Sequence, residues 1–352
     1  MKIPKIIHQT WETTDIPPEF REYVASWKKF HPDWKYMLWT EEMRRGFIKK
    51  SFPWFLEHYD RYPKNMQRAD AFRYFLLYEI GGLYVDLDFE CLKSMDGLIG
   101  DSETCLLGLE PDLHCQIWKK EKIICNAWMA SPPKHEFFKE VFQNLIKYAD
   151  LDVLNSTGPF MLTKMYDSSQ CNNIQLFSSK VLYPLTSLDL HNLQLGLTTK
   201  IIEKNLANAY AVHYFASTRS PAPADKYFTI GTKNLKPIFI TLGLPISEYL
   251  RIFPKIGSGE ADLHLLNSAQ HWLEKVHSIN RAKRIYLDPG FSRLWAELWF
   301  TVCFQSHHLG IISWKLFWQS PLSRTNRISL RQKLKFAFLS LTKSSKKSFR
   351  TD

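Results

Sequence analysis

The chain has 352 residues, of which 45% are hydrophobic and 23% charged, ordinary values for a globular protein that exclude a disordered chain, a collagen-like repeat and a disulfide-stabilised miniprotein. Its net charge of +11 lies entirely within residues 281–352, where 14 basic residues accompany three acidic ones. A nucleic-acid enzyme would more often carry its positive charge on the catalytic body, so this distribution argues against nucleic acid as a partner.

Two β-rich segments near the start of the chain are separated by a helical one. The apolar run 3–11 predicts a buried strand, residues 19–30 predict a helix that ends near Pro32, and residues 34–39 predict a second strand. A strand–helix–strand order is typical of a βαβ unit, so we expect a parallel sheet.

A longer helix and a third strand follow. Residues 64–79 predict a helix that Gly81 and Gly82 end, with an apolar stripe made of Met66, Ala69, Phe72, Phe75 and Leu76. In the strand predicted at 83–89, apolar residues alternate with Tyr84, Asp86 and Asp88. Because successive side chains of a strand point to opposite faces, Asp86 and Asp88 are predicted to share one face. Such a pair can hold a hard divalent cation, which in turn neutralises a diphosphate.

The tripeptide Asp86-Leu87-Asp88 is a weak signal on its own. The same Asp-Leu-Asp recurs at 150–152, after a helix predicted at 136–148, where it indicates a helix end or a loop. About one chance Asp-x-Asp is expected in a chain of this size, and an isolated match is most often a solvated strand face. Whether either tripeptide forms a metal site therefore depends on the residues around it.

The context of the first tripeptide is specific. Residues 65–88, with Asp70 and Arg73 before the Gly-Gly turn, resemble the DXD glycosyltransferases of family 32. That family includes fungal mannosyltransferases acting on glycans and on inositol phosphoceramide, and bacterial polysaccharide transferases, and it is remotely similar to the clostridial glucosylating toxins. The runs 3–11 and 34–39 and a Thr157-Gly158-Pro159 turn match further motifs in the same order, so the resemblance covers about residues 1–220.

The resemblance implies a fold and a domain arrangement. Residues 1–250 are expected to form a GT-A catalytic domain, an α/β fold in which a mostly parallel, Rossmann-like sheet is flanked by helices. Residues 251–352 are expected to form a helical, basic and aromatic-rich C-terminal extension.

The resemblance also implies a metal site and a donor-sugar site. Asp86, Asp88 and His213 are similar to the residues on the metal side, for Mn²⁺ or Mg²⁺. Asp70 and Arg73 match a pair that holds the donor sugar, and positions i and i+3 share one helix face, although an exposed ion pair is the alternative for them. With the two DXD carboxylates they form the expected catalytic set.

Three further residues are implied in donor binding. Trp11 is similar to an aromatic residue that stacks on the nucleotide base, with core packing as its alternative. Asn126 matches an asparagine near the donor or acceptor. Thr218 keeps the hydroxyl of a Ser-Trp pair whose tryptophan is replaced here by Arg219, a residue that can neutralise phosphate charge.

The expected reaction is the metal-dependent, retaining transfer of a hexosyl group. The donor would be a UDP- or GDP-linked sugar and the acceptor a hydroxyl of a glycan or a lipid-linked molecule. Three alternatives stay open: a glycoside hydrolase, a carbohydrate- or membrane-binding module without activity, and an effector-type glycosyltransferase that modifies a protein.

The C-terminal residues predict a location. Residues 294–318 are apolar but interrupted by charged and polar residues, and residues 330–341 place an apolar stripe opposite basic residues. We expect an interfacial helix on an anionic cytoplasmic leaflet, with a helical hairpin packed on the body as the alternative. The six scattered cysteines, without zinc-type spacing, and the absence of a signal-peptide pattern at Met1 agree with a peripheral protein on the cytoplasmic face of a membrane.

Overall fold

The computed structural model describes residues 1–186, 189, 204–216, 247–248, 251, 265, 268–269 and 271. The chain divides into two compact units, one formed by Met1–Leu190 with Ile201–Gly243 and the other by His191–Lys200 with Leu244–Asp352. The secondary structure described below belongs to the first unit. The helices predicted between 281 and 352, and with them the boundary at 250, lie outside the described residues.

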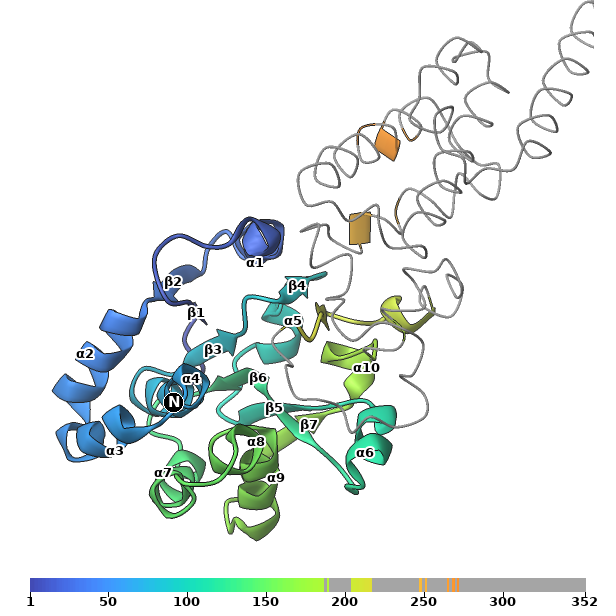
Figure 1. Cartoon of the computed structure of the whole chain (residues 1–352). Coiled ribbons are helices and arrows are strands. Elements are labelled where there is room, and N and C mark those ends of the chain that lie inside the picture. Colours follow the sequence, from blue (N-terminus) through green and yellow to red (C-terminus); the bar gives the residue numbers. More distant parts are fainter. Residues whose placement is uncertain are drawn as a thin grey trace, which may run out of the picture. The chain divides into compact units, whose positions relative to one another are not determined.

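A six-stranded sheet organises the first unit, in the order β2-β1-β3-β6-β5-β7 (Figure 1). β1 runs parallel to β2 and β3, β5 runs parallel to β7, and only β6 is antiparallel to its neighbours β3 and β5. These strands are Ile6–Thr10 (β1), Lys35–Trp39 (β2), Gly82–Val85 (β3), Cys105–Leu109 (β5), Ile124–Ser131 (β6) and Ile174–Phe177 (β7).

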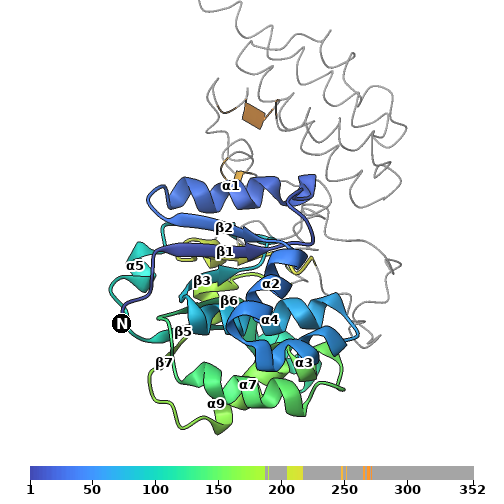
Figure 2. The same cartoon turned by 90° about the vertical axis from the view of Figure 1, so that its left-hand side faces the viewer.

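Two short strands form a second sheet. β4 (Phe89–Cys91) and β8 (Ala211–His213) pair antiparallel, with Phe89 opposite His213. The predicted βαβ unit is present, because β1 and β2 lie side by side in parallel (Figure 2) and α1 (Arg21–Phe30) connects them. A mostly parallel sheet flanked by helices is the predicted GT-A type of α/β fold, and that prediction is confirmed.

Helices cover the large sheet. α4 (Asn65–Glu79) packs on β3 and β6 and is itself covered by α2 (Glu41–Ser51), α3 (Leu56–Arg61) and α7 (Phe137–Lys147), while α9 (Pro159–Ser168) packs on β6. α1 packs on β4, and α10 (Ser179–Leu182) contacts β5, β7 and β8. The remaining short helices are α5 (Asp96–Ile99), α6 (Asp112–Trp118), α8 (Val153–Ser156) and the 3₁₀ turns Pro18–Phe20 and Pro53–Phe55.

The long central helix α4 begins and ends where the sequence predicts, but its packing differs. The prediction of a single apolar stripe was wrong, because residues 69–77 are buried on every side of the helix, between the sheet and the helices α2 and α7. Met66, assigned to that stripe, is exposed in the first turn. The core around α4 therefore also encloses polar side chains, including those of Asp70 and Arg73.

The Gly81–Gly82 turn feeds α4 directly into β3. Both glycines have positive φ, +72° and +98°, which L side chains rarely adopt. A Cβ on Gly82 would lie 2.8 Å from the carbonyl oxygen of Ile6, because β1 passes close by. This tight turn fixes the position of α4 relative to β3, and so holds the side chains of α4 close to the end of β3.

In the part of the chain that the structure describes, no helix combines the length and the apolar character needed to cross a membrane. The five described cysteines are all free thiols.

Candidate active site

The DXD tripeptide lies in a turn and not within a strand. β3 ends at Val85, the backbone N–H of Asp86 still donates to Ala127 of β6, and the chain then leaves the large sheet. A hydrogen bond from the N–H of Phe89 to the carbonyl of Asp86, 3.2 Å, closes the turn before β4 begins. The prediction of one continuous strand over 83–89 was therefore wrong, because the chain passes from one sheet to the other at this tripeptide.

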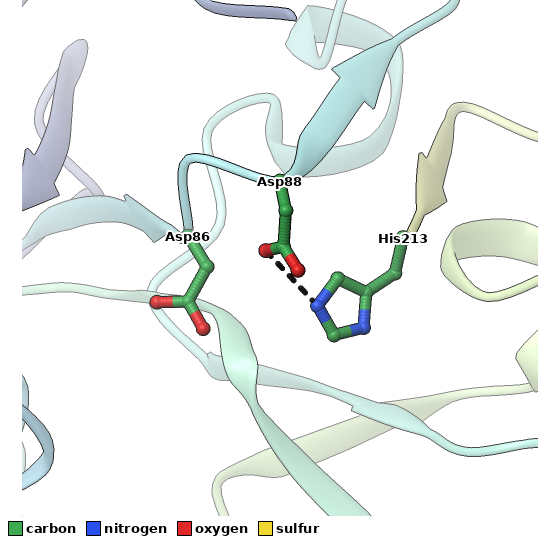
Figure 3. Close-up of side chains that lie close together, drawn as sticks. All are labelled: Asp86, Asp88 and His213. Carbon is green, nitrogen blue, oxygen red and sulfur yellow. Dashed lines mark hydrogen bonds and ion pairs between the residues drawn. The ribbon is translucent and has the colours of Figure 1, made fainter. Parts of the chain in front are cut away.

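Three potential ligands converge at this turn. Atoms of Asp86, Asp88 and His213 that can bind a metal all lie within 4.8 Å of one another (Figure 3). His213 reaches the turn because β8 pairs with β4, and its Nε2 lies 3.2 Å from Oδ1 of Asp88. The backbone N–H of Ala216 donates to the other oxygen of Asp88 at 2.7 Å. The predicted trio is thus assembled by residues 125 positions apart in the chain.

The electrostatics of the trio are asymmetric. Burial opposes ionisation of Asp88, yet the neighbouring His213 and the N–H of Ala216 hold its pKa below the ordinary value. Burial likewise lowers the pKa of His213, but the carboxylate of Asp88 outweighs that effect and raises it. Burial raises the pKa of Asp86, against the attraction of Arg73. Without a bound cation, Asp88 and His213 therefore form an ion pair beside a carboxylate that is harder to ionise.

The donor set fits a divalent cation. Carboxylate oxygens suit Mg²⁺ and Mn²⁺, and an imidazole nitrogen beside two of them favours the softer Mn²⁺. The ring nitrogen of His213 that faces the two carboxylates is Nε2, so this is the atom that would bind the cation (Figure 3). The side chain of Asp86 is 28% exposed, which leaves the trio open on one side.

A buried ion-pair network adjoins the trio. The guanidinium of Arg73 lies 2.8 Å from Asp70 and 3.3 Å from Asp86, and it donates to the carbonyl of Asn126 at 2.7 Å. It also stacks over the ring of Tyr84, 4.5 Å from the centroid. The side chains of Arg73 and Asp70 are 3% and 6% exposed, so the alternative of an exposed surface pair is wrong. Arg73 thus links the predicted sugar-binding helix to the DXD turn.

Asp70 is held on both oxygens. Nδ2 of Asn126 donates to Oδ1 and the hydroxyl of Thr157 donates to Oδ2, each at 3.1 Å. Burial raises the pKa of Asp70 to about 6, against the opposing charge of Arg73. Asn126, in the first half of the antiparallel strand β6, therefore contacts both members of the Asp70–Arg73 pair, and its predicted place near the donor or acceptor stays a prediction.

Sequence reasoning assigned no role to two members of this network. The hydroxyl of Tyr84 donates to Oδ1 of Asp86 at 2.7 Å, and Thr157 bonds Asp70 as described above. The signal for Tyr84 was present, because the period-two pattern puts it with the carboxylates, and Thr157 belongs to the Thr-Gly-Pro turn.

The two other residues predicted to bind the donor, Trp11 and Thr218, have no described contact with the trio or with the Asp70–Arg73 pair. Trp11 follows β1, so it lies at the same edge of the sheet as Asp86, and its half-buried ring makes an edge contact with Phe20, with centroids 5.7 Å apart. Thr218 and Arg219 lie outside the described residues.

The known proteins that this chain is similar to are glycosyltransferases. The family profile "Glycosyltransferase sugar-binding region containing DXD motif" matches residues 17–105. The chain is 40% identical over 174 residues to inositol phosphoceramide mannosyltransferase 2 of Schizosaccharomyces pombe, a match that covers 47% of this chain and 46% of the relative. It is 30% identical over 223 residues to the uncharacterized glycosyltransferase L373 of Acanthamoeba polyphaga mimivirus, covering 60% of this chain and 85% of the relative.

The extent of these matches differs. The chain spans about half the length of the yeast relatives. The family profile, over residues 17–105, includes α4 and the DXD turn. Among solved structures it is similar to the PaToxG glycosyltransferase, with 18% identity, a TM-score of 0.37 and coverage of 58% of this chain and 79% of that one.

Proposed function

Because the chain belongs to the glycosyltransferases that carry a DXD motif, we propose that it transfers a mannosyl group from a nucleoside diphosphate sugar to a lipid-linked polyol of the inositol phosphoceramide type. The convergence of Asp86, Asp88 and His213 carries the proposal of a metal-dependent transfer. The names of the yeast relatives support the choice of mannose and of a sphingolipid acceptor.

The trio would hold Mn²⁺, and the cation would neutralise the charge that develops on the departing diphosphate. Asp88 is already ionised by its neighbours and provides the firmest carboxylate ligand. Asp86 is shared with Arg73 and Tyr84, so it faces both the cation and the sugar side of the site.

Arg73 and Asp70 act on the sugar side. The guanidinium presents several N–H donors in a fixed plane, and its contacts with Asp70, Asp86 and the carbonyl of Asn126 lock its orientation before a donor arrives. An oriented cation at the bond that breaks stabilises the leaving phosphate without rearrangement of the protein. Oδ1 of Asp70 already serves Asn126 and Arg73, so Asp70 can accept a hydrogen bond from a sugar hydroxyl through the lone pair of Oδ2 that Thr157 does not use.

We propose retention of configuration by attack on the face from which the diphosphate leaves. The bond between the anomeric carbon and the phosphate oxygen breaks, the acceptor oxygen bonds to that carbon, and the acceptor proton passes to the released phosphate. This route requires no general base from the protein.

The geometry favours this reaction over a glycoside hydrolase. A retaining hydrolase places two carboxyl groups about 5–5.5 Å apart on opposite sides of the bond that it cleaves. Asp86 and Asp88 converge with an imidazole, which suits a cation better than opposed acid and nucleophile roles. No described contact favours a protein acceptor.

A screen of UDP- and GDP-linked hexoses tests the proposal. With Mn²⁺, the protein should hydrolyse one of them slowly in water and transfer its sugar faster to inositol phosphoceramide in detergent micelles. A chelator should abolish both activities. Hydrolysis that is undiminished by the chelator would contradict the metal assignment, whereas transfer to a protein but not to the lipid would support the effector-type alternative.

We also propose that residues 281–352 bring the enzyme to the cytoplasmic face of an anionic membrane. Their entire excess of +11 charges supports it, since each basic residue near an anionic surface contributes about 1 kcal/mol. Flotation with anionic liposomes should capture the full chain at low salt and less of it at high salt. A chain truncated before Phe291 should not float yet should keep its melting temperature. A drop in that temperature would favour the hairpin packed on the body.

A further inference from the structure

A second carboxylate lies at the same sheet edge as the DXD turn. Glu110 directly follows β5, which points in the same direction as β3 because both pair antiparallel with β6. Its backbone N–H donates to Ile123, the residue before β6, at 2.9 Å. Glu110 and Asp86 thus follow two strands that flank β6, on either side of the residue pair Cys125 and Asn126.

Glu110 is held in a defined orientation. Nδ1 of His114, one turn further along in α6, lies 2.9 Å from its Oε2, and the two side chains are only 12% and 9% exposed. The carboxylate also interacts with the thiol of Cys125, whose pKa is raised mainly by burial and further by Glu110. A carboxylate has about four acceptor positions, so these two partners leave some of them for a ligand.

This carboxylate lies beside the trio without belonging to it. The ring of Phe215 bridges the two groups, with its centroid 4.7 Å from that of His114 and 4.2 Å from that of His213. Burial lowers the pKa of His213, Asp88 and then Asp86 raise it, and Glu110 has the smallest effect of the three carboxylates, as expected for a neighbour outside the trio. Glu110 is absent from the set of atoms that converge within 4.8 Å.

Backbone strain marks the same place. Phe215 has a φ of +52°, in the left-handed region that a residue with a bulky side chain seldom occupies. The conformation directs the next N–H, that of Ala216, to Asp88 while the ring stays between the two histidines. Such strain is kept where surrounding contacts impose it, commonly at functional sites.

The hydroxyl of Tyr183 is a further polar group in this neighbourhood. The side chain is fully buried, its hydroxyl lies beside the thiol of Cys125, and its ring packs 5.7 Å from His213. A Cβ added to Gly108 of β5 would meet that ring, so Tyr183 lies directly over the strand that ends at Glu110.

We propose that Glu110, oriented by His114, is the residue that binds the acceptor, through hydrogen bonds from hydroxyl groups of a sugar or cyclitol ring. The proposal rests on the proposed glycosyl transfer and adds the group that positions its second substrate. Asp86 and Arg73 serve the donor on one side of β6, and Glu110 serves the acceptor on the other. His114 is a positioning residue, because it acts through the carboxylate.

Glu110→Gln tests the proposal, with the donor found in the screen, Mn²⁺ and inositol phosphoceramide micelles. Loss of a hydrogen bond to a charged group should lower transfer to the acceptor about 10- to 100-fold, mainly through the KM of the acceptor. Donor hydrolysis in water and Mn²⁺-dependent binding of nucleoside diphosphate should stay within about twofold of the unaltered protein. Glu121→Gln, an exposed control on the loop before β6, should change none of these quantities.

His114 gives an independent readout. His114→Asn keeps a nitrogen donor near the position of Nδ1 and should retain most of the transfer, whereas His114→Phe should lose it as Glu110→Gln does. Two results would overturn the proposal: transfer by Glu110→Gln equal to that of the unaltered protein, or a parallel loss of donor hydrolysis and nucleotide binding, which would put Glu110 in the donor site.

Failure of the proposed function would look different. In that case the unaltered protein would hydrolyse no nucleotide sugar at all with Mn²⁺. If it hydrolyses a donor but ignores the sphingolipid, a simple alkyl mannoside replaces the acceptor, and the same ratio of transfer to hydrolysis decides the role of Glu110.

Discussion

The chain contains the tripeptide Asp-Leu-Asp twice, and the two copies have different structures. In the first, Asp88 and Leu87 are 4% exposed, and the two carboxylates converge with His213. In the second, Leu151 is 47% exposed, and Asp152 caps α8 by accepting hydrogen bonds from the N–H groups of Leu154 and Asn155. One copy passes between two sheets, and the other ends a loop in solvent.

The difference lies in the partners and not in the tripeptide. Before the first copy, α4 and the Gly-Gly turn bring Asp70 and Arg73 to its side, and β8 brings His213 from much later in the chain. The only carboxylate of the second copy with described hydrogen bonds is that of Asp152, which accepts from the N–H groups of Leu154 and Asn155 and from the side chain of Asn155, while Gln67 of α4 reaches only the backbone carbonyl of Leu151. A buried carboxylate needs partners to stay ionised, and those partners turn a common sequence pattern into a candidate metal site.

The largest difference in transfer and in metal binding is expected when one aspartate of each copy is replaced by asparagine. Asp88→Asn should lower transfer about 10²- to 10⁴-fold and abolish Mn²⁺-dependent binding of nucleoside diphosphate, because it removes a ligand of a cation that contributes several kcal/mol. Asp152→Asn should leave both unchanged and cost less than about 0.5 kcal/mol of stability, because Asn caps a helix as well as Asp does. Calorimetric titration and a melting curve for each variant measure this. Undiminished metal-dependent binding by Asp88→Asn would remove the metal assignment.

The next largest loss of transfer is expected from a change at Arg73. Its buried guanidinium contacts Asp86 of the first copy, and the second copy has no such neighbour among the described residues. Arg73→Lys keeps the charge but loses the planar fork that reaches Asp70, Asp86 and the carbonyl of Asn126. We expect transfer to fall about tenfold or more, with the affinity for nucleoside diphosphate reduced less than about threefold. Arg68→Lys, on the same helix but partly exposed, is the control. Equal losses of turnover and affinity would mean that Arg73 contacts the diphosphate only.

Removing the charge of Arg73 altogether should destabilise the protein. Arg73→Gln leaves the buried Asp70 and the partly buried Asp86 without their cation, and breaking the buried pair with Asp70 costs about 3–5 kcal/mol. Denaturant unfolding measures the loss. A loss below about 1 kcal/mol would show that water or another cation takes over the role of the guanidinium.

Much of this arrangement could be predicted from local patterns. The helices predicted at 19–30, 64–79 and 136–148, which correspond to α1, α4 and α7, the βαβ unit and the i, i+3 pairing of Asp70 with Arg73 follow from patterns within a few residues of sequence. The turn at Asp86 could not be read this way, because alternation continues through it while the chain changes sheets. The burial of α4 on all sides and the contact of Thr157 with Asp70 depend on packing between distant segments. His213 was reached only through the resemblance, since a lone histidine carries no local signal.

A pH series tests the ion pair that the second copy lacks. The pKa of His213 is raised by Asp88, so the stability that this pair contributes is present below the ordinary histidine value and is lost as pH rises through the raised value. Below the raised pKa, Mn²⁺ must displace a proton from the ring in order to bind there. The affinity for Mn²⁺ should therefore rise up to about tenfold per pH unit in that range and level off above it. His213→Gln should flatten the profile, and an unchanged slope would exclude the imidazole as a ligand.

The smallest change in Mn²⁺ affinity and transfer is expected from removing the tyrosine hydroxyl that lies beside each copy. The hydroxyl of Tyr84 donates to Asp86 at 2.7 Å, whereas that of Tyr148, just before the second copy, accepts from Lys164 in solvent. Tyr84→Phe removes a hydrogen bond to a partly buried carboxylate whose ionisation is already opposed by its loss of hydration, so the pKa of Asp86 should rise further and Mn²⁺ should bind more weakly. A hydrogen bond to a charged group contributes about 1.5–3 kcal/mol, but Arg73 remains within reach of the same carboxylate, so we expect only about a 3- to 10-fold loss of Mn²⁺ affinity and of transfer.

Tyr148→Phe should change neither quantity, because an exposed interaction of this kind contributes little. Raising the pH should restore part of the affinity in Tyr84→Phe, since a carboxylate with a raised pKa ionises again at higher pH. If both tyrosine variants behave alike, the contact between Tyr84 and Asp86 has no role in metal binding, and Arg73 alone keeps the first carboxylate of the DXD turn ionised.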